Sequence, residues 1–313
     1  MPLLAVLVLM GCFIFMSGEL TELCLAGLKL CAGTIIPSLF PFFVLCSTLN
    51  SMGLPGVIGN HLARPAAKIY GISGAGASAI IIGLTGGYPL GAAYIADMEK
   101  SGAISASEGE RLIGFCNNSG PAFIVGAVGC GVFHSAKTGL ILYAVHIISA
   151  LITGLFMRNK SSFSEIQPVQ LDSTDPALCF TNAVKSSVAS ILNICGFIVF
   201  FTLLLGLCES SGLTESITNF LYRYCHINKL ISRAFLFGFT ELGSGIGVLQ
   251  GLRLCPQSLS LTAFILGFGS ISVYIQTKAV LSGSKIKGTL HFAGHLMCAS
   301  IGAVLAYIIG LFL

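Results

Sequence analysis

Charged residues are scarce in this chain of 313 residues, and their scarcity argues against a soluble fold. Only 9% of the residues are Asp, Glu, Lys or Arg, whereas 55% are hydrophobic, and the mean hydropathy is +0.91. A soluble protein needs polar side chains to cover its core, and this chain has too few of them. The composition therefore predicts a protein that lies in a lipid bilayer.

The chain also lacks the patterns of the common kinds of chemical site. Its net charge of +4 is spread over short loops without basic and aromatic clusters, which gives a nucleic-acid partner no support. Its 12 cysteines form no C-x-x-C pair and no Cys/His ligand spacing, and most lie inside apolar runs, where cysteine packs as a small hydrophobe. No H-E-x-x-H, no P-loop and no G-x-S-G with a placed histidine occurs. We therefore expect no enzyme activity, metal or cofactor.

One pattern is written twice along the chain. The first copy reads GLTGGYPLG from Gly83 and GFCNNSGP from Gly114, and the second reads GFTELGSG from Gly238 and GFGSISVY from Gly267, at offsets of 155 and 153 residues. The likeness extends on both sides of these landmarks. It divides the chain into an N-terminal transmembrane helix (residues 1–25), a first repeat (26–158), a polar linker (159–181) and a second repeat (182–313).

Each repeat has the same succession of predicted helices. An apolar run of about 20 residues is long enough to cross a hydrocarbon core of ~30 Å at 1.5 Å per residue. By this measure, spanning helices are expected at 31–50, 139–157, 187–208 and 288–311, with a further membrane helix at 2–17. Basic residues alternate with apolar ones at 55–70 and 214–233, as in helices that lie at the membrane surface.

Two other apolar segments in each repeat are interrupted by residues that break helices. Gly86, Gly87 and Pro89 lie in the middle of 74–98, and TELGSG lies in the middle of 234–252. Unpaired backbone groups in lipid cost several kcal/mol, so such interruptions are buried in protein or line a wet cavity. We predict re-entrant helical hairpins here, with tips at 85–89 and 240–245. Discontinuous spanning helices are predicted at 106–133, interrupted by NNSGP, and at 260–281.

Three crossings per repeat place the second repeat upside down relative to the first. The predicted fold is an all-α polytopic membrane protein of two inverted repeats, each with a re-entrant hairpin and a discontinuous transmembrane helix, with seven crossings in total. In this topology ten of the 16 basic residues lie on one side of the membrane. The positive-inside rule then puts the N-terminus and the linker in the cytoplasm.

The polar residues at the interruptions are the candidate solute contacts. Broken helices from both repeats of such proteins meet near the middle of the membrane, and their free backbone N–H groups favour an anion or a carboxylate. We therefore expect one cavity for a small polar or anionic solute. The two asparagines have an equal alternative as helix caps. The predicted substrate-binding residues are Thr85, Tyr88, Asn117, Asn118, Ser119, Thr240, Ser244, Ser270, Ser272 and Gln276.

Glu241 is the one acidic residue, of 12, in the middle of an apolar run. An ionisable group there costs at least ~2.5 kcal/mol, which makes it a functional candidate. It is predicted to carry a coupling proton or to bind a coupling sodium ion. The alternative is a neutral Glu that is bonded to the backbone at the hairpin tip. His291 and His295 have a spacing that suits a metal, but without a third ligand we expect them to pack in the interior.

Several segments together resemble one known family. LFPFF at 39–43, GLTGGYPLGA from Gly83, SASEGERLIGFCNNSGP from Ser105 and LGFGSISVYIQ from Leu266 are similar to the sporulation integral membrane protein YlbJ family. This resemblance covers most of the chain. It implies the Gate, or nucleoside-recognition, domain group, whose fold is similar to that of concentrative nucleoside transporters. It also implies a multi-pass protein of the cell membrane that acts in endospore formation.

The resemblance further implies a substrate, which is dipicolinate moved across the outer forespore membrane. Two other functions stay open: a sporulation membrane protein that transports nothing and organises a complex, and a nucleoside transporter. The expected partners are the lipid bilayer and the small solute. Association with a second copy or with other sporulation membrane proteins is left open.

Overall fold

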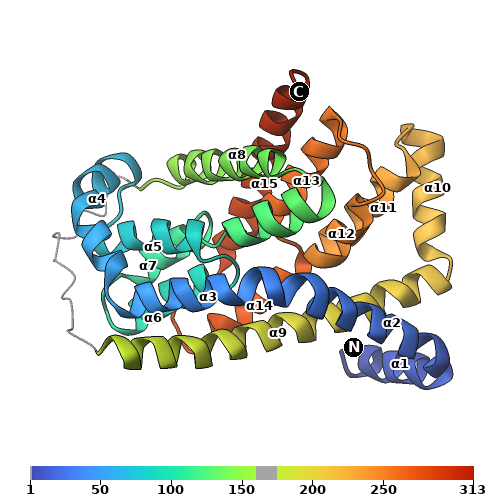
Figure 1. Cartoon of the computed structure of the whole chain (residues 1–313), viewed down its shortest axis with the longest axis horizontal. Helices are drawn as coiled ribbons and strands as arrows, with labels where there is room; N and C mark the ends of the chain where they lie inside the picture. Colours follow the sequence, from blue (N-terminus) through green and yellow to red (C-terminus); the bar gives the residue numbers. More distant parts are fainter. Residues whose placement is uncertain (1, 160–174) are drawn as a thin grey trace.

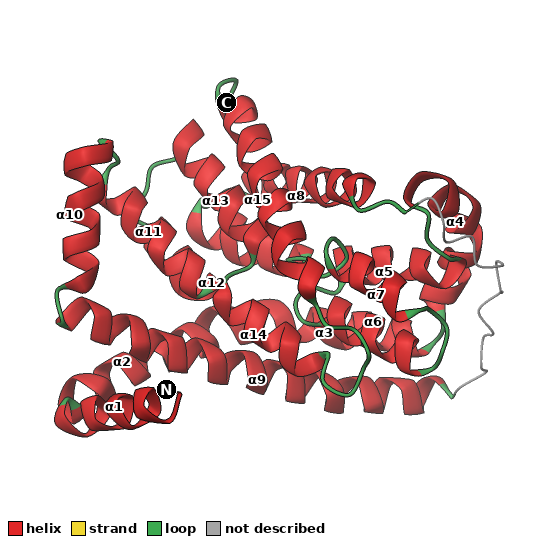
Figure 2. Cartoon of the chain, turned by 180° about the vertical axis from the view of Figure 1, so that it is seen from behind, coloured by secondary structure: helices red, strands yellow, loops and turns green. Residues whose placement is uncertain are grey.

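The computed structural model describes residues 2–159 and 175–313, and every secondary-structure element in them is a helix (Figures 1 and 2). The prediction of an all-α fold is confirmed for these residues. Most of the predicted linker at 159–181, namely residues 160–174, lies outside the described residues.

The first half begins with a long apolar helix. After α1 (Pro2–Phe15), helix α2 (Ser17–Leu30) continues through the π-helical segment η1 (Cys31–Ile35) into α3 (Ile36–Ser51). Residues 18–51 together form one candidate membrane span of 34 residues. The spanning helix predicted at 31–50 is therefore confirmed and longer than expected. The predicted boundary at residue 25 falls inside α2.

The helices of the second half follow the order of those in the first half. In each half a long helix, which in the first half is the continuous segment 18–51, is followed by a shorter one. Two pairs of helices that each flank an interruption come next, and then a closing helix. In the first half these are α4 (Leu54–Tyr70), α5 (Gly74–Thr85), α6 (Leu90–Lys100), α7 (Ala106–Ile113), η2 (Ala122–Val132) and α8 (Ala136–Phe156) after α3. In the second half they are α9 (Pro176–Ser210), α10 (Leu213–Cys225), α11 (Lys229–Thr240), α12 (Leu242–Leu249), α13 (Pro256–Phe268), α14 (Ile271–Val280) and α15 (Thr289–Gly310). The inversion of the second half and the repeat boundaries stay predictions.

The interruptions lie where glycine and proline predicted them. Residues 86–89 separate α5 from α6, and Glu241 alone separates α11 from α12. Glycine lets the two helices of each pair approach closely. A Cβ added to Gly91 would lie 3.1 Å from the Cα of Gly83, and one added to Gly245 would collide with the backbone of Gly238. That each pair returns to its own side of the membrane stays a prediction.

The candidate membrane spans are fewer than the seven crossings predicted. Among the described residues, five helices are long and apolar enough to cross, or six if α4 and α5, which meet at a 94° bend, form one broken span. Helix α1 has 14 residues and reaches only about 21 Å at 1.5 Å per residue. Residues 114–120 interrupt the segment 106–133, and neither remaining helix is long enough to cross alone. The discontinuous spanning helix predicted there stays a prediction.

The two segments predicted to lie at the membrane surface differ from each other. Helix α4 bends directly into α5, and the two helices together are long and apolar enough to form one broken span. The other segment, 214–233, is not one helix, because α10 ends at Cys225 and α11 begins at Lys229. Helix α10 exposes Phe220, Tyr222 and Tyr224.

Carboxylates of the first half cap backbone groups of the second half. Glu110 in α7 accepts hydrogen bonds from the N–H groups of Gly288 (2.7 Å) and Thr289 (3.0 Å), where α15 begins. Glu99 accepts one from the N–H of Lys285 (3.0 Å). A carboxylate at a helix N-terminus satisfies unpaired donors and the helix dipole. These bonds hold the two halves together at one end of the molecule.

Candidate functional site

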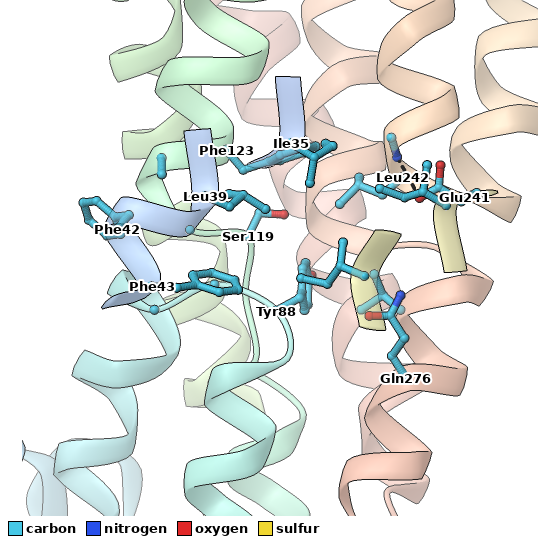
Figure 3. A pocket seen from close by; sticks show the side chains of 18 residues that line it. Ile35, Leu39, Phe42, Phe43, Tyr88, Ser119, Phe123, Glu241, Leu242 and Gln276 are labelled. Carbon is cyan, nitrogen blue, oxygen red and sulfur yellow. Dashed lines mark hydrogen bonds between the residues drawn. The ribbon is translucent and has the colours of Figure 1, made fainter. Parts of the chain in front are cut away.

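One cavity lies where the interruptions of both halves meet (Figure 3). About 600 Å³ of space between atoms belongs to it, its open side included. Three of the four interruptions contribute to its lining: residues 86–88 between α5 and α6, 119–120 between α7 and η2, and Glu241 between α11 and α12. On the side of the fourth interruption, between α13 and α14, Val273 and Gln276 of α14 line the cavity. The broken helices of the two halves therefore converge on one place, as predicted from the sequence.

The lining of this central cavity is mostly apolar. Its polar side chains are those of Tyr88, Ser119, Glu241 and Gln276. An apolar lining with a few polar groups is typical of sites for small molecules. The cavity thus suits a molecule with an apolar or aromatic body and few polar groups. The large apolar side chains are Ile35, Leu39, Phe42, Phe43, Phe123, Ile194, Ile198, Leu242 and Val273.

Glu241 lines the cavity and also caps a helix. Its side chain is 3% exposed, and its backbone is extended, with φ −144° and ψ 125°. One carboxylate oxygen accepts the N–H of Gly243 (2.9 Å), and the other accepts the N–H of Ser244 (2.5 Å). The backbone-bonded alternative for Glu241 therefore describes its contacts in this structure. Glu241 is the one carboxyl group among the described residues that line the cavity.

Tyr88 and Ser119 reach from the first half to the interrupted end of α13. Both hydroxyls donate to the carbonyl of Leu266, at 3.4 Å and 3.3 Å. The Tyr88 hydroxyl also lies 3.2 Å from Nδ1 of His295, and that nitrogen is 3.1 Å from the carbonyl of Gly267. The last carbonyls of a helix lack partners inside it. Side chains of the first half thus donate hydrogen bonds to a backbone carbonyl at an interruption of the second half.

Asn117 is fully buried and does not line the cavity. Its Oδ1 accepts the N–H of Ala92 (3.2 Å), and its Nδ2 donates to Oγ1 of Thr277 (3.0 Å) and lies 3.3 Å from Nε2 of His291. The neighbouring Asn118 donates from Nδ2 to the carbonyl of Phe115 (2.8 Å). In this structure both asparagines bind protein groups, which is their alternative role.

The other predicted contacts also bond to the protein. Thr85 and Thr240, which end α5 and α11, each donate to the carbonyl four residues earlier (2.7 Å and 2.8 Å). Ser272 accepts a hydrogen bond from Nε2 of Gln276 (3.2 Å). Of the predicted residues, the central cavity brings together Tyr88, Ser119, Glu241 and Gln276. Those outside its lining are Thr85, Asn117, Asn118, Thr240, Ser244, Ser270 and Ser272.

In three of the interrupted helices, some of the N-terminal N–H groups that were expected to be free are capped by side chains. Glu241 caps α12, and Ser270 caps α14 by accepting the N–H of Val273 (3.3 Å). Asn117 accepts the N–H of Ala92 in the first turn of α6. Polar residues at a helix break are favoured as caps because they satisfy these donors locally. In this structure the same N–H groups are therefore not free to bind an anion.

The sequence did not reveal the π-helical walls of the cavity. Ile35 comes from η1, and Ala122 and Phe123 come from η2. π-Helical turns are rare and are frequent at functional sites. The LFPFF segment, noted only for its resemblance, supplies Leu39, Phe42 and Phe43 to the lining. In the sequence, only that segment could have indicated which residues form this side of the cavity.

The two histidines of α15 pack in the interior. The rings of His291 and His295 stack with their centroids 4.1 Å apart, and both side chains are at most 2% exposed. Among residues 2–159 and 175–313, no group of three His, Cys, Asp or Glu side chains could hold a metal ion. Stacking and burial agree with the packing role expected for them.

Comparison with known proteins gives one relative. No family model matches the chain, and no solved structure matches it. The "Sporulation integral membrane protein YlbJ" of Bacillus subtilis (strain 168) is 29% identical over 304 residues, which cover 89% of this chain and 74% of that protein. Together with the candidate membrane spans, this similarity makes the chain a multi-pass integral membrane protein and a homologue of the sporulation integral membrane protein YlbJ.

Proposed function

We propose that this protein is a secondary transporter that carries a small solute through the central cavity. One observation supports the proposal above all, which is that interrupted helices of both halves line a single cavity. Interrupted helices at membrane depth are typical of transporters, in which they form the solute and ion sites. A protein that only organises a complex through its loops has no need of such a cavity or of a buried carboxyl group in it.

We rank dipicolinate first among the candidate solutes. The homologue is named for sporulation, and the family resemblance implies dipicolinate movement across the outer forespore membrane. The flat ring would pack between apolar and aromatic walls such as Phe43 and Phe123. A carboxylate of the solute would find a donor in the amide of Gln276, which has a second N–H besides the one donated to Ser272. A nucleoside, with a flat base and a polar sugar, is the second candidate on the same grounds.

Glu241 supports coupling of this transport to a proton or a sodium ion. An ionised Glu241 in a cavity with few other polar groups repels a dicarboxylate, because charges interact strongly where water is scarce. A bound proton or a sodium ion at Glu241 removes that repulsion. Solute and coupling ion would therefore enter the cavity together, and the protein would carry out no chemical reaction on the solute.

Uptake by purified protein in liposomes tests this proposal. Labelled dipicolinate, uridine and adenosine are offered in parallel, with an imposed proton gradient, an imposed sodium gradient or neither. We expect gradient-driven accumulation of one solute, dipicolinate first, in liposomes that contain the protein and not in empty ones. Folded protein that accumulates none of these solutes under any gradient contradicts the proposal and favours the complex-organising alternative.

A further inference from the structure

Two more cavities flank the central cavity. One, here named the serine cavity, lies between α3, α6 and α9 and is lined by Ser186, Ser187 and Ser190 together with Asp97. The other, here named the ion-pair cavity, lies between α2, α9, α11 and α12 and is lined by Glu209 and Arg233. Both have more polar linings than the central cavity.

The three cavities follow one another along α9. In order along this helix, the lining residues include Ser186 and Ser190 in the serine cavity, Ile194 and Ile198 in the central cavity, and Thr202 and Gly206 in the ion-pair cavity. Residues four apart on a helix are neighbours, so these six form a continuous stripe. From Ser186 to Glu209 the helix rises about 35 Å at 1.5 Å per residue, close to the ~30 Å of a hydrocarbon core.

The facing wall repeats this order in the opposite direction. Helices α2 and α3 run beside α9 in both views of the molecule (Figures 1 and 2). Their lining residues include Gly27 and Leu30 in the ion-pair cavity, Leu39 and Phe43 in the central cavity, and Ser47 and Asn50 in the serine cavity. Two walls, from different halves of the chain, therefore place the three cavities in the same sequence.

A single barrier separates each pair of neighbouring cavities. Phe43, which is 2% exposed, lines both the serine cavity and the central cavity. At the other end, Glu241 lines the central cavity and Ser244 lines the ion-pair cavity, and the Ser244 N–H donates to the Glu241 carboxylate. The tip between α11 and α12 is thus the second barrier.

Polar groups lie at both ends of this row and apolar ones in its middle. Arg233 and Glu209 form an ion pair of 2.6 Å, and their side chains are 45% and 36% exposed. At the opposite end are three serines and Asp97. An ion pair and hydroxyls at the two ends, about one bilayer thickness apart, match the two polar surfaces of a membrane.

We propose that the solute crosses the membrane along this stripe of α9, through the serine cavity, the central cavity and the ion-pair cavity in turn. Phe43 is the barrier on one side of the central cavity, and the α11–α12 tip is the barrier on the other. This proposal rests on the proposed transport function and adds to it the route, the two entrances and the two barriers.

Bulky substitutions along the stripe test the route. Ser190→Trp and Thr202→Trp would fill the serine and ion-pair cavities, whereas Leu192→Trp points outward from α9, where Leu192 is 64% exposed. We expect the initial rate of solute uptake into liposomes to fall about tenfold or more in the first two variants and less than about twofold in the third, because only a blocked passage stops flux. Equal uptake by all three folded variants overturns the route.

Cysteine substitutions test the two entrances and remain informative if the tryptophan variants do not fold. Ser190→Cys and Thr202→Cys are treated in liposomes with a membrane-impermeant methanethiosulfonate reagent on one side, with the native cysteines of the wild type as the background. We expect each new thiol to react from one side only, and the two from opposite sides. Reaction of both from the same side, or of neither, overturns the proposal. The labelling does not require that solute is transported. If the two thiols react from opposite sides but the wild type takes up no solute, the result contradicts the proposed transport function and leaves the two entrances standing.

Discussion

Asn117 and Thr277 are 160 positions apart in the chain and are joined by a buried hydrogen bond of 3.0 Å. Asn117 lies in the interruption between α7 and η2, and Thr277 lies in α14, the helix that follows the interruption between α13 and α14. The same amide accepts the N–H of Ala92 and lies 3.3 Å from Nε2 of His291. One side chain therefore joins broken helices of both halves just behind the central cavity.

Removal of this amide should destabilise the protein strongly. In Asn117→Ala the Ala92 N–H and the Thr277 hydroxyl lose a buried partner, and each loss costs about 1–3 kcal/mol. Asn118→Ala removes one bond, to the Phe115 carbonyl, and serves as the matched control. Thermal unfolding in detergent, followed by circular dichroism, should show a larger drop in Tm for Asn117→Ala. Equal drops would mean that Asn117 does not hold the halves together.

Glu241 can be tested by a pair of variants that both cap α12. Asp and Asn are both good N-cap residues, but only Asp can carry a proton or bind a cation strongly. We expect Glu241→Asp and Glu241→Asn to melt at similar temperatures, whereas gradient-driven accumulation should survive in part in the first and fall about tenfold or more in the second. Exchange of solute across the membrane without a gradient should persist in both. Full accumulation by Glu241→Asn would reduce Glu241 to a helix cap.

Two glycines of α12 provide a test of the close contact between α11 and α12. A methyl group at Gly245 would collide with the backbone of Gly238, whereas one at Gly247 meets no atom within 4 Å. Gly245→Ala should therefore cost about 3 kcal/mol or more, as overpacking against backbone does at its worst. Gly247→Ala should be neutral or stabilising by up to about 1 kcal/mol, since alanine favours helix. Melting temperatures that fall equally would show that α11 and α12 do not pack as described.

The carboxylates that join the halves should contribute according to the number of their bonds. Glu110 accepts from the N–H groups of Gly288, Thr289 and Leu290 and from the Thr289 hydroxyl, whereas Glu99 accepts from the N–H of Lys285 alone. We expect Glu110→Ala to cost about 1–2 kcal/mol, as loss of a helix cap does, and Glu99→Ala less. Chemical denaturation in detergent measures both. A smaller effect for Glu110→Ala than for Glu99→Ala would contradict the capping of α15.

The sequence predicts the interruptions well because glycine and proline act locally. Gly86, Gly87 and Pro89 disfavour helix wherever they occur, so the end of α5 follows from composition and spacing alone. The buried carboxyl of Glu241 is likewise visible, because an acidic residue inside an apolar run has few innocuous explanations.

The partners of the polar residues could not be predicted from the sequence. Asn117 and Tyr88 were predicted as solute contacts, and nothing in the sequence indicated that they bond to Thr277 and Leu266 of the other half. Such choices depend on how the two halves pack, and no local pattern carries that information. The π-helical segments η1 and η2 also depend on packing, because one extra residue per turn leaves little trace in composition.

The span count shows the limit of hydropathy. Residues 2–17 and 106–133 are apolar enough to suggest crossings, yet α1 is short for a span, and 106–133 contains no continuous helix of that length because residues 114–120 are not helical. Polar pairing within the protein, such as the bonds of Asn117 and Asn118, holds this extended segment in place. An apolar segment in a membrane protein is therefore not always a span.

Solute uptake by a variant with a filled cavity tests the central claim most directly. Val273 lines the central cavity, whereas Val304 is 59% exposed on α15, so Val273→Phe and Val304→Phe make the same change inside and outside the site. In liposomes under an imposed ion gradient, we expect Val304→Phe to accumulate labelled dipicolinate as the wild type does and Val273→Phe to lose this accumulation while it remains folded. Wild-type rates in a folded Val273→Phe protein would contradict transport through the cavity.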